Sequence, residues 1–600
     1  MGSACSRKRG QLVQEDDLYS ARFSKSGSFK WLLHTLPRSN FADVQRRAQG
    51  PAPNRCPSLV ELCVAKVCKD INMYSDLSLL PRDLSQQIFN ELVECGCLTE
   101  ASLGAFRDCD LQDICLGDYP GVTDAWMEVV ASQGQSLLSV DLSCSDVTDS
   151  GFNLLKDCSS MQSLACDYCD QISEHGLKTL SGFSNLTSLS IKKCAAVTAE
   201  GAKAFANLVN LVNLDLERCP KINGGLIHLK GLKKLEKLNL RYCNGITDSD
   251  MKYLSDLTNL RELQLCSCKI SAFGVSYLRG LHKLGHLNLE GCAVTAICLE
   301  LQAKHLGAPN FTKTQICAIA ELASLVLLNL SRCGICDEGC ENLKGLTKLK
   351  ALSLGFNQIT DACLIHLKDL VNLECLNLDS CKIGDEGLFH LKGLRNLQSI
   401  NLSFTLVTDI GLKKISGLSS LKSLNLDNRQ ITDTGLASLT GLTGLTHLDL
   451  FGARITDSGM SCFRFFKNIQ SLEVCGGLIT DAGVKNIKDL KALTLLNLSQ
   501  NGKLTDKTLE LISGTFPLFS PSAFISTRLC SSQELHLLTG LTALVSLNVS
   551  NSRVSNSGLH HLKPLQNLRS LSLESCRVTA SEMDKLRLVA LPNLISVRPE

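Results

Sequence analysis

The feature that most constrains this chain is a pattern that recurs from about residue 111 to the C-terminus. Each copy follows L-x-x-L-x-L-x-x-C/N-x-x-I/V-T-D-x-G-L-x-x-L, and most copies are 24 or 25 residues apart. Eighteen central L-x-L-type pairs can be aligned, the first starting at Ile114 and the last at Leu571. One copy alone cannot bury its leucines, whereas stacked copies share a continuous core. The sequence therefore predicts an array of stacked units.

Within each copy, the spacing predicts a short strand followed by a helix. Both leucines of L-x-L point to the same side of a strand. The Thr-Asp pair that follows, as in Thr456-Asp457, is a helix N-cap signal. The pattern resembles the leucine-rich repeat of the cysteine-containing, ribonuclease-inhibitor-like type. It implies an α/β solenoid, a horseshoe with a parallel β ladder on the concave face and helices on the convex face.

Many of the 30 cysteines share one position of the repeat, three residues after the second leucine. They are Cys169, Cys194, Cys219, Cys243, Cys268, Cys292, Cys333, Cys381 and Cys576. Asn357 and Asn501 take the same position, and both residue types suit a buried turn. Zinc needs closely paired ligands, so the pattern favours packing over a metal site. We expect no metal and no cofactor, and a reducing, intracellular compartment.

The chain begins Met1-Gly2-Ser3-Ala4-Cys5-Ser6-Arg7-Lys8-Arg9, which fits an N-myristoylation signal. Gly2 would carry myristate, Cys5 could carry palmitate, and the basic triplet would face anionic headgroups. This pattern predicts attachment to the cytosolic face of the plasma membrane. The alternative is a disordered basic tail, since residues 1–57 are rich in Ser, Arg, Pro and Gly.

Residues 58–110 differ from the repeats and contain two amphipathic helical patterns. Leu59, Cys63 and Val67 share one helix face. In the second pattern Pro suits the helix start, and its apolar residues are Leu80, Pro81, Leu84, Ile88 and Phe89. One interpretation is a cap that shields the open edge of the first repeat.

The other interpretation rests on resemblance. Leu80-Pro81-x-x-Leu84-x-x-x-Ile88-Phe89 resembles the opening of an F-box, which docks on a Skp-type adaptor of a cullin–RING ubiquitin ligase, although the Cys-Arg-x-Trp ending of that family is missing. Leu59-x-x-x-Cys63-x-x-x-Val67 resembles an elongin-C-binding box of the VHL type. Both resemblances imply that these residues bind a ligase adaptor.

Over nearly its full length the chain is similar to a plant family of intracellular leucine-rich-repeat proteins that are grouped with F-box/leucine-rich-repeat receptors. The similarity includes the MGxxCSRKR start, the LPRDLSQQIFNELV segment and the closing residues Leu591 to Glu600. It implies a receptor for a protein client.

Two long steps interrupt the repeats, which otherwise span residues 111–600. The step from Leu287 to Leu328 is 41 residues and that from Leu496 to Leu547 is 51. The extra residues fall near 303–318 and 515–540. They are either binding loops or accidental sequence.

The residues beside the leucines are expected to face a client on the concave surface. Early repeats offer a charged patch: Lys192, Lys193, Glu217, Arg218, Arg241 and Tyr242. Later repeats offer a sparse apolar stripe: Phe356, Phe404 and Phe451. Exposed aromatic side chains are common interface anchors; the alternative is that these rings turn inward and seal the repeats.

The sequence favours a binding protein over an enzyme. It has no nucleotide-binding glycine loop, no HExxH and no GxSxG. A formal net charge of +2 argues against a general nucleic-acid binder. The leading hypothesis is a substrate receptor of a cullin–RING (SCF-like) ubiquitin ligase, and the alternative is a membrane-attached signalling scaffold with no ligase role.

Overall fold

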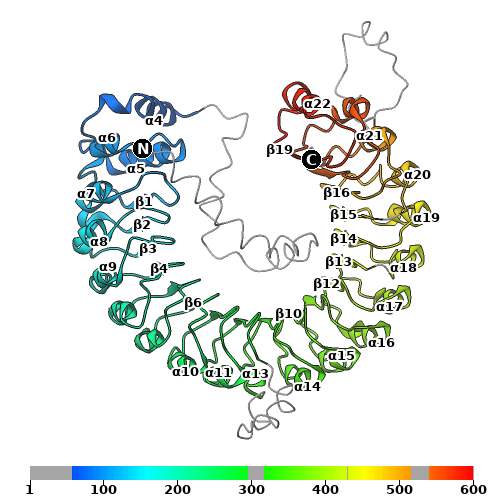
Figure 1. Cartoon of the computed structure of the whole chain (residues 1–600), viewed down its shortest axis with the longest axis horizontal. Helices are drawn as coiled ribbons and strands as arrows, with labels where there is room; N and C mark the ends of the chain where they lie inside the picture. Colours follow the sequence, from blue (N-terminus) through cyan, green and yellow to red (C-terminus); the bar gives the residue numbers. More distant parts are fainter. Residues whose placement is uncertain (1–56, 295–316, 429, 477, 515–539, 599–600) are drawn as a thin grey trace. The chain divides into compact units, whose positions relative to one another are not determined.

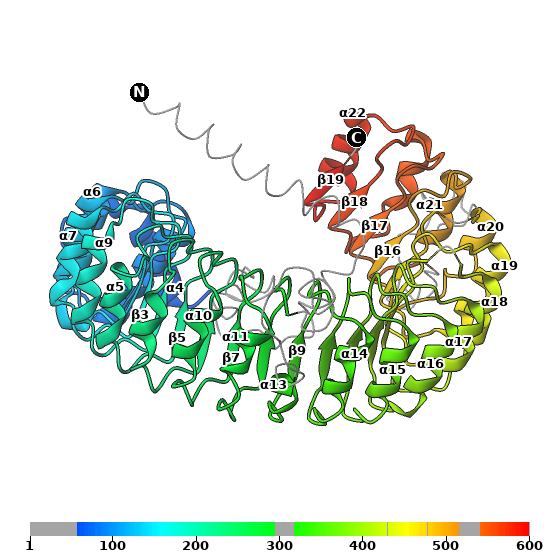
Figure 2. The same cartoon turned by 60° about the horizontal axis from the view of Figure 1, so that its bottom comes forward.

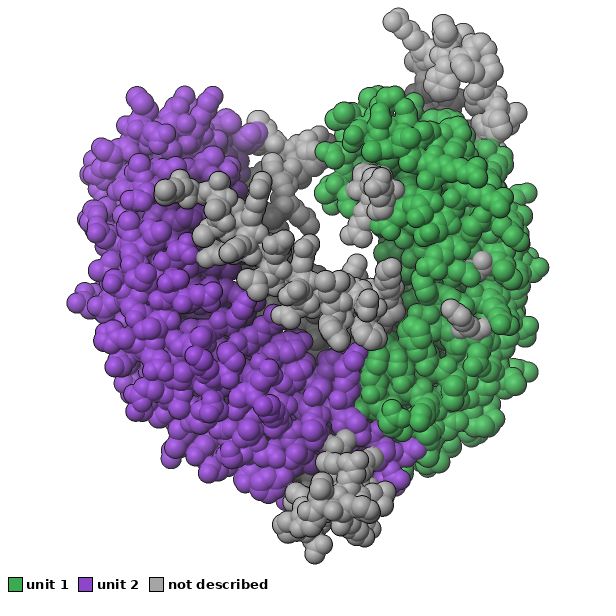
Figure 3. Space-filling model, viewed as in Figure 1, with its two compact units in different colours: residues 1–37, 350–600 green, residues 38–349 purple. Residues whose placement is uncertain are grey.

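Two compact units make up the protein in the computed structural model, which describes residues 57–294, 317–428, 430–476, 478–514 and 540–598. Figure 3 distinguishes unit 2, which ends at residue 349, from unit 1, which contains residues 350–600. Within each unit, parallel strands line one face and short helices the other (Figures 1 and 2). This arrangement confirms the predicted leucine-rich-repeat solenoid fold class.

The strands are three residues long, and β1 to β18 lie on the predicted leucine pairs. Unit 2 contains β1 (Asp113–Cys115), β2 (Ser139–Asp141), β3 (Ser163–Ala165), β4 (Ser188–Ser190), β5 (Asn213–Asp215), β6 (Lys237–Asn239), β7 (Glu262–Gln264), β8 (His286–Asn288) and β9 (Leu327–Asn329). Unit 1 contains β10 (Ala351–Ser353), β11 (Cys375–Asn377), β12 (Ser399–Asn401), β13 (Ser423–Asn425), β14 (His447–Asp449), β15 (Ser471–Glu473), β16 (Leu495–Asn497), β17 (Ser546–Asn548), β18 (Ser570–Ser572) and β19 (Ser596–Arg598).

Each strand pairs in parallel with the next one in its unit, and the central leucines stay in register. Leu214 pairs with Leu238 in unit 2, and Leu448 pairs with Leu472 in unit 1. These leucines are almost completely buried. A shift of one residue would move them to the solvent face, so their burial fixes the register.

The opposite face holds α-helices and 3₁₀ turns. In unit 2 the α-helices are α4 (Leu59–Lys69), α5 (Arg82–Glu94), α6 (Glu100–Leu103), α7 (Asp124–Ser132), α8 (Asp149–Asn153), α9 (Glu174–Leu177), α10 (Asp248–Met251), α11 (Ala272–Ser276), α13 (Cys317–Ala320) and α14 (Asp337–Cys340). In unit 1 they are α15 (Asp361–Leu367), α16 (Asp385–Leu388), α17 (Asp409–Ile415), α18 (Asp433–Ser438), α19 (Asp457–Met460), α20 (Asp481–Val484), α21 (Asp506–Ser513) and α22 (Ala580–Lys585).

The Thr-Asp pair joins neighbouring repeats as well as starting a helix. The Thr480 hydroxyl accepts a hydrogen bond from the Ala482 N–H, which caps α20. The same Thr480 donates its N–H and its hydroxyl to the two carboxylate oxygens of Asp457 in the preceding repeat, at 2.8 and 2.6 Å. We call this pair of bonds the carboxylate clasp. Equivalent clasps join Asp385 to Thr408 and Asp124 to Thr148.

The clasp also explains the glycine of T-D-x-G. A Cβ added at Gly387 would lie 2.5 Å from Asp361 Oδ1 of the preceding repeat, too close for a side chain. Before Gly201 and Gly225, two positions that lack the Thr-Asp pair, the segment is a 3₁₀ helix.

The shared cysteine position is a packing position. The Cys243 thiol is buried and donates to the Leu216 carbonyl oxygen of the preceding repeat at 3.1 Å. Cys268 and Cys292 repeat this contact, and burial raises the pKa of the Cys243 thiol to about 12. Asn501 replaces the thiol with its amide, which donates to the Val474 carbonyl at 2.8 Å.

The two irregular insertions fall mostly on residues 295–316 and 515–539, outside the described part of the chain. Among the described residues, no helix has the length and apolar character needed to cross a bilayer.

Candidate interaction surface

The segment before the repeats divides into a capping helix and an outer helix. The Gln86 side chain of α5 binds the edge of the first strand: its oxygen accepts from the Gln112 N–H at 3.0 Å, and its amide donates to the Asp113 carbonyl at 2.6 Å. Ile88 and Phe89 are buried, and Phe89 packs edge-on against Phe106 at 5.4 Å between ring centroids. Helix α5 therefore covers the open end of unit 2.

Helix α4 packs on α5 but leaves its apolar residues in solvent. Ser58 and Glu61 form a capping box at its start. Val64 is its one buried residue, whereas Leu59 is 77% exposed and Leu62 is 53% exposed. We call Leu59, Leu62 and Cys63 the α4 outer face. An apolar helix face in water is typical of a docking surface.

The predicted adaptor-binding residues are thus split between surface and core. Leu59, Cys63 and Pro81 are exposed, Val67, Leu80 and Leu84 are half-buried, and Ile88 and Phe89 lie in the core. The exposed ones belong to the elongin-C-type pattern more than to the F-box-type pattern. Gly2 and Cys5, the predicted lipidation sites, lie outside the described residues.

The predicted charged patch lies on the strand face of unit 2, where its charges alternate between neighbouring repeats. Lys192 Nζ lies 3.1 Å from a carboxylate oxygen of Asp167 and 3.6 Å from one of Asp215. Burial opposes the positive charge on Lys192, but these two carboxylates outweigh it and raise the pKa of the lysine. Arg241 follows Glu217 in the same column of positions. Most charges in this column therefore lie near an opposite charge of the same protein.

A second column of positions, one residue further along, is exposed at Tyr168, Lys193 and Arg218 and half-buried at Tyr242. Its residues have left-handed backbone conformations, with φ of 59° at Tyr168, 52° at Lys193, 60° at Arg218 and 58° at Tyr242. Lys193 Nζ lies 5.5 Å from the centre of the Tyr168 ring, and the Arg218 guanidinium lies 5.2 Å from that of Tyr242. We call these four residues the turn quartet.

Sequence reasoning found three members of the quartet and missed Tyr168. It also missed Asp167 and Asp215, the acidic partners of Lys192. The repeat spacing contained the signal, because Tyr168 stands one residue before Cys169, as Lys193 stands before Cys194.

The three predicted phenylalanines do not share one position of the repeat. Phe356 and Phe404 occupy the left-handed column, with φ of 59° and 52°. Phe451 stands one residue earlier in its repeat, where the left-handed residue is Gly452. The Phe404 ring is 57% exposed, whereas Phe356 and Phe451 are half-buried. Phe404 therefore offers the most accessible aromatic surface of the three.

Acidic residues gather on the strand face of unit 1. Asp449 accepts a hydrogen bond from the Phe451 N–H at 2.9 Å. Burial, the neighbouring Glu473 carboxylate and Asp427 together raise the pKa of Asp449 to about 8, although the Phe451 bond lowers it. We call Asp427, Asp449 and Glu473 the acidic ladder.

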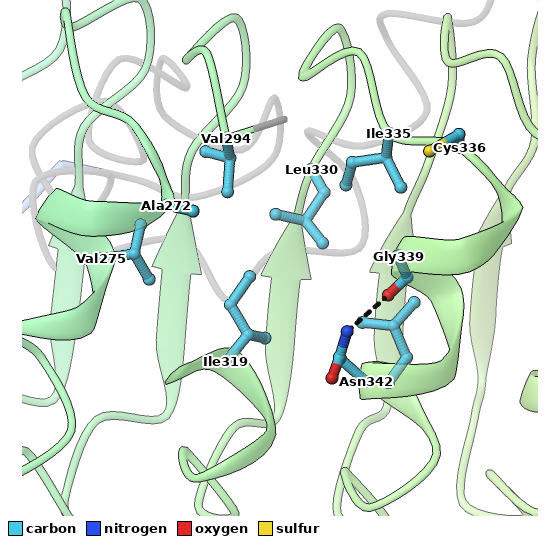
Figure 4. A pocket seen from close by; sticks show the side chains of 10 residues that line it. Ala272, Val275, Val294, Ile319, Leu330, Ile335, Cys336, Gly339 and Asn342 are labelled. Carbon is cyan, nitrogen blue, oxygen red and sulfur yellow. Dashed lines mark hydrogen bonds between the residues drawn. The ribbon is translucent and has the colours of Figure 1, made fainter. Parts of the chain in front are cut away.

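Unit 2 also contains a small apolar cavity beside α11 and β9 (Figure 4). Its lining includes Ala272, Val275, Val294 and Ile319, and its volume is about 40 Å³. Ligand pockets for small molecules are typically several hundred Å³. This cavity is therefore a packing gap.

Comparisons with known proteins agree with this geometry. A leucine-rich-repeat family model matches residues 395–455, and a second matches residues 184–206, 231–255, 322–344, 345–365 and 370–391. No curated protein sequence matches the chain.

Solved structures of other proteins match this chain at low sequence identity. An internalin from Listeria monocytogenes is 20% identical, with 72% of this chain and 89% of that chain covered and a TM-score of 0.38. A leucine-rich-repeat protein of Leptospira interrogans is 18% identical, with 74% and 91% covered and a TM-score of 0.41. The plant peptide hormone receptor RGFR1, solved with RGF2, is 15% identical, with 85% and 84% covered and a TM-score of 0.37. The repeat geometry gives this chain a leucine-rich-repeat fold, and leucine-rich-repeat family models match parts of its sequence.

Proposed function

We propose that this protein is an interaction receptor that holds a protein client on its strand face and docks a ubiquitin-ligase adaptor on the α4 outer face. The observation that supports the adaptor site is that the two helices before the repeats make different contacts. Helix α5 closes the edge of β1 through Gln86. Helix α4 is then not needed to cap the first strand, and it exposes Leu59, Leu62 and Cys63 to solvent.

The pattern of exposure favours an elongin-C-type adaptor over a Skp-type adaptor. The F-box-like residues Ile88 and Phe89 are already packed in the core. The elongin-C-like residues Leu59 and Cys63 remain available, with Val67 half-buried beside them. A substrate receptor of a cullin–RING ligase is the function that this surface supports best.

A pull-down with purified elongin C and a Skp-type adaptor tests the proposal. Leu59→Arg should abolish adaptor capture, because it places a charge in the apolar contact, and it should leave folding intact because the side chain is in solvent. Val209→Arg is the matched control, since Val209 is an exposed apolar residue on the helix side of unit 2, away from α4. Failure of both adaptors to bind the wild-type protein would contradict the ligase function.

For location, we propose attachment to the cytosolic face of the plasma membrane through Gly2 and Cys5. Gly2→Ala should move the protein from the membrane fraction to the soluble fraction. Cys5→Ser should weaken attachment less completely, because the basic triplet Arg7-Lys8-Arg9 remains. Continued membrane association of Gly2→Ala would contradict lipidation as the anchor. If the protein is membrane-bound and captures neither adaptor, the signalling scaffold becomes the better description.

A further inference from the structure

The turn quartet differs from the rest of the charged strand face because its two cations are not committed to carboxylates. Lys192, one column away, is held between Asp167 and Asp215. Among the described residues no ion pair involves Lys193. Arg218 has Glu217 at 4.0 Å, the outer limit for an ion pair. Both cations are exposed.

The quartet also holds these cations in defined places. Lys193 and Arg218 stand on the turns after β4 and β5, one repeat apart, which separates their backbones by about 5 Å. The Lys193 side chain lies toward Tyr168 on one side of the pair, and the Arg218 side chain lies toward Tyr242 on the other, where Arg241 also lies 5.6 Å from the ring centre. Cation–π contact restrains the long side chains without neutralising them.

Two neighbouring cations fit one compact anion of high charge. A phosphate monoester carries close to two negative charges at neutral pH and three acceptor oxygens. Lys193 and Arg218 would bind it together by turning their side chains from the tyrosine rings toward each other. The flanking tyrosine rings would cover the apolar part of the residue that bears the phosphate. A carboxylate offers half the charge and leaves one cation unsatisfied.

The surroundings disfavour a long polyanion. The repeat of β6 adds Lys237 and Arg241 to this face, and the repeats after it place Glu262 on β7 and Glu290 after β8, all partly exposed. A nucleic acid lying across several repeats would meet these carboxylates with its phosphates. A peptide that carries one phosphate and, further along, a basic residue would instead be attracted both by the cations of the turn quartet and by these carboxylates.

We propose that the turn quartet of unit 2 binds a phosphorylated side chain of a client peptide, with a basic residue of the same peptide directed toward Glu290. The repeats between Arg218 and Glu290 span about 15 Å, which corresponds to four or five residues of extended chain. The proposal rests on the proposed function only in taking the strand face as the client surface, and it does not depend on the adaptor.

A degenerate peptide array tests the proposal with the full-length protein. The array carries a fixed phosphoserine, phosphothreonine or phosphotyrosine with randomised flanking residues, and a duplicate is treated with phosphatase. We expect retention on the phosphorylated array alone, enriched for Lys or Arg four or five residues from the phosphate. Equal retention on both arrays would overturn the proposal.

Variants then locate the site. Lys193→Ala and Arg218→Ala should each weaken a fluorescein-labelled peptide selected from the array about tenfold, the loss of one charge-assisted hydrogen bond. Glu290→Lys should weaken peptides with the distant basic residue and leave peptides without it unchanged. Lys203→Ala is the matched control, since Lys203 pairs with Glu200 on the helix side.

Three outcomes would overturn the assignment: unchanged affinity in Lys193→Ala and Arg218→Ala, tighter binding of a single-stranded oligonucleotide than of any phosphopeptide, or full retention of a peptide with glutamate in place of the phosphoresidue. Because no step uses an adaptor, failure here leaves the adaptor pull-down informative, and the reverse also holds.

Discussion

The strand faces of the two units differ in how charged side chains are arranged on neighbouring repeats. In unit 2, charges alternate from repeat to repeat, so Lys192 stands between Asp167 and Asp215. In unit 1, the acidic ladder stacks Asp427, Asp449 and Glu473 on consecutive repeats, and the pKa of Asp449 rises to about 8. Asp449 and Glu473 take the same position on strands about 4.8 Å apart, and Asp427 stands two positions further along its own repeat. In a repeat protein, the effect of a charged residue on stability therefore depends on the charges of the neighbouring repeats.

The largest effect on stability is expected when one of the alternating charges of unit 2 is removed. Lys192→Met should destabilise unit 2 by about 1–3 kcal/mol, because it leaves two partly buried carboxylates without their cation. Hydrogen exchange should speed up in β3 to β6 and stay unchanged in β11 to β15, which serve as the internal reference. Lys203→Met, which removes an exposed pair, should change stability by less than about 0.5 kcal/mol. Equal effects of the two variants would show that alternation does not stabilise unit 2.

The acidic ladder should respond in the opposite direction and only at higher pH. The folded pKa of Asp449 lies above its ordinary value of 3.8, so the folded protein retains a proton that the unfolded chain has released. Stability conferred by this proton is therefore lost as pH rises from about 4 toward 8. Asp449→Asn should raise the Tm of unit 1 at pH 9 by an amount that disappears near pH 4.

The matched control for that variant is Asp489→Asn, since Asp489 is an exposed acid outside the ladder in the same unit. It should leave the pH profile unchanged. A Tm gain for Asp449→Asn that is the same at pH 4 and pH 9 would show that the ladder does not titrate as described.

The smallest expected effect on stability is at Phe404. This exposed aromatic residue of unit 1 has no counterpart among the paired charges of unit 2. Because the ring is 57% exposed, Phe404→Ala should change the free energy of unfolding by less than about 0.5 kcal/mol, while weakening client binding. The reference is Phe463→Ala, a fully buried ring of the same unit, which should cost about 3–5 kcal/mol. A large loss of stability in Phe404→Ala with binding intact would place the ring in the core.

The sequence predicted the fold well because one spacing rule governs both strand and core. Each aligned leucine pair became a strand, and β19 was missed although Leu591-Pro-Asn-Leu594 has the same spacing as Leu565-Gln-Asn-Leu568. The carboxylate clasp was not predicted, because the Thr-Asp pair looks like an ordinary helix start and its second role depends on the neighbouring repeat.

Less of the candidate surface could be predicted. Residue positions identified Lys192 and Lys193 alike as client-facing, but only the three-dimensional arrangement separates them. Lys192 points into a pair of carboxylates, and Lys193 stands over Tyr168 in solvent. Likewise, the helical pattern of residues 58–110 gave no means to tell that Phe89 is buried while Leu59 is not.

The carboxylate clasp has a consequence for how such a chain can lengthen over generations. A repeat that contains the Thr-Asp pair presents an Asp to the next copy and a Thr to the previous one, so the two ends of such a repeat are complementary. A duplication of 24 residues restores both bonds at its borders, whatever the point at which the copy begins. The clasp also tolerates extra residues within a repeat, since Asp506 binds Ser555 across the 51-residue step. The bonding pattern thus favours growth in whole repeats and allows their length to vary.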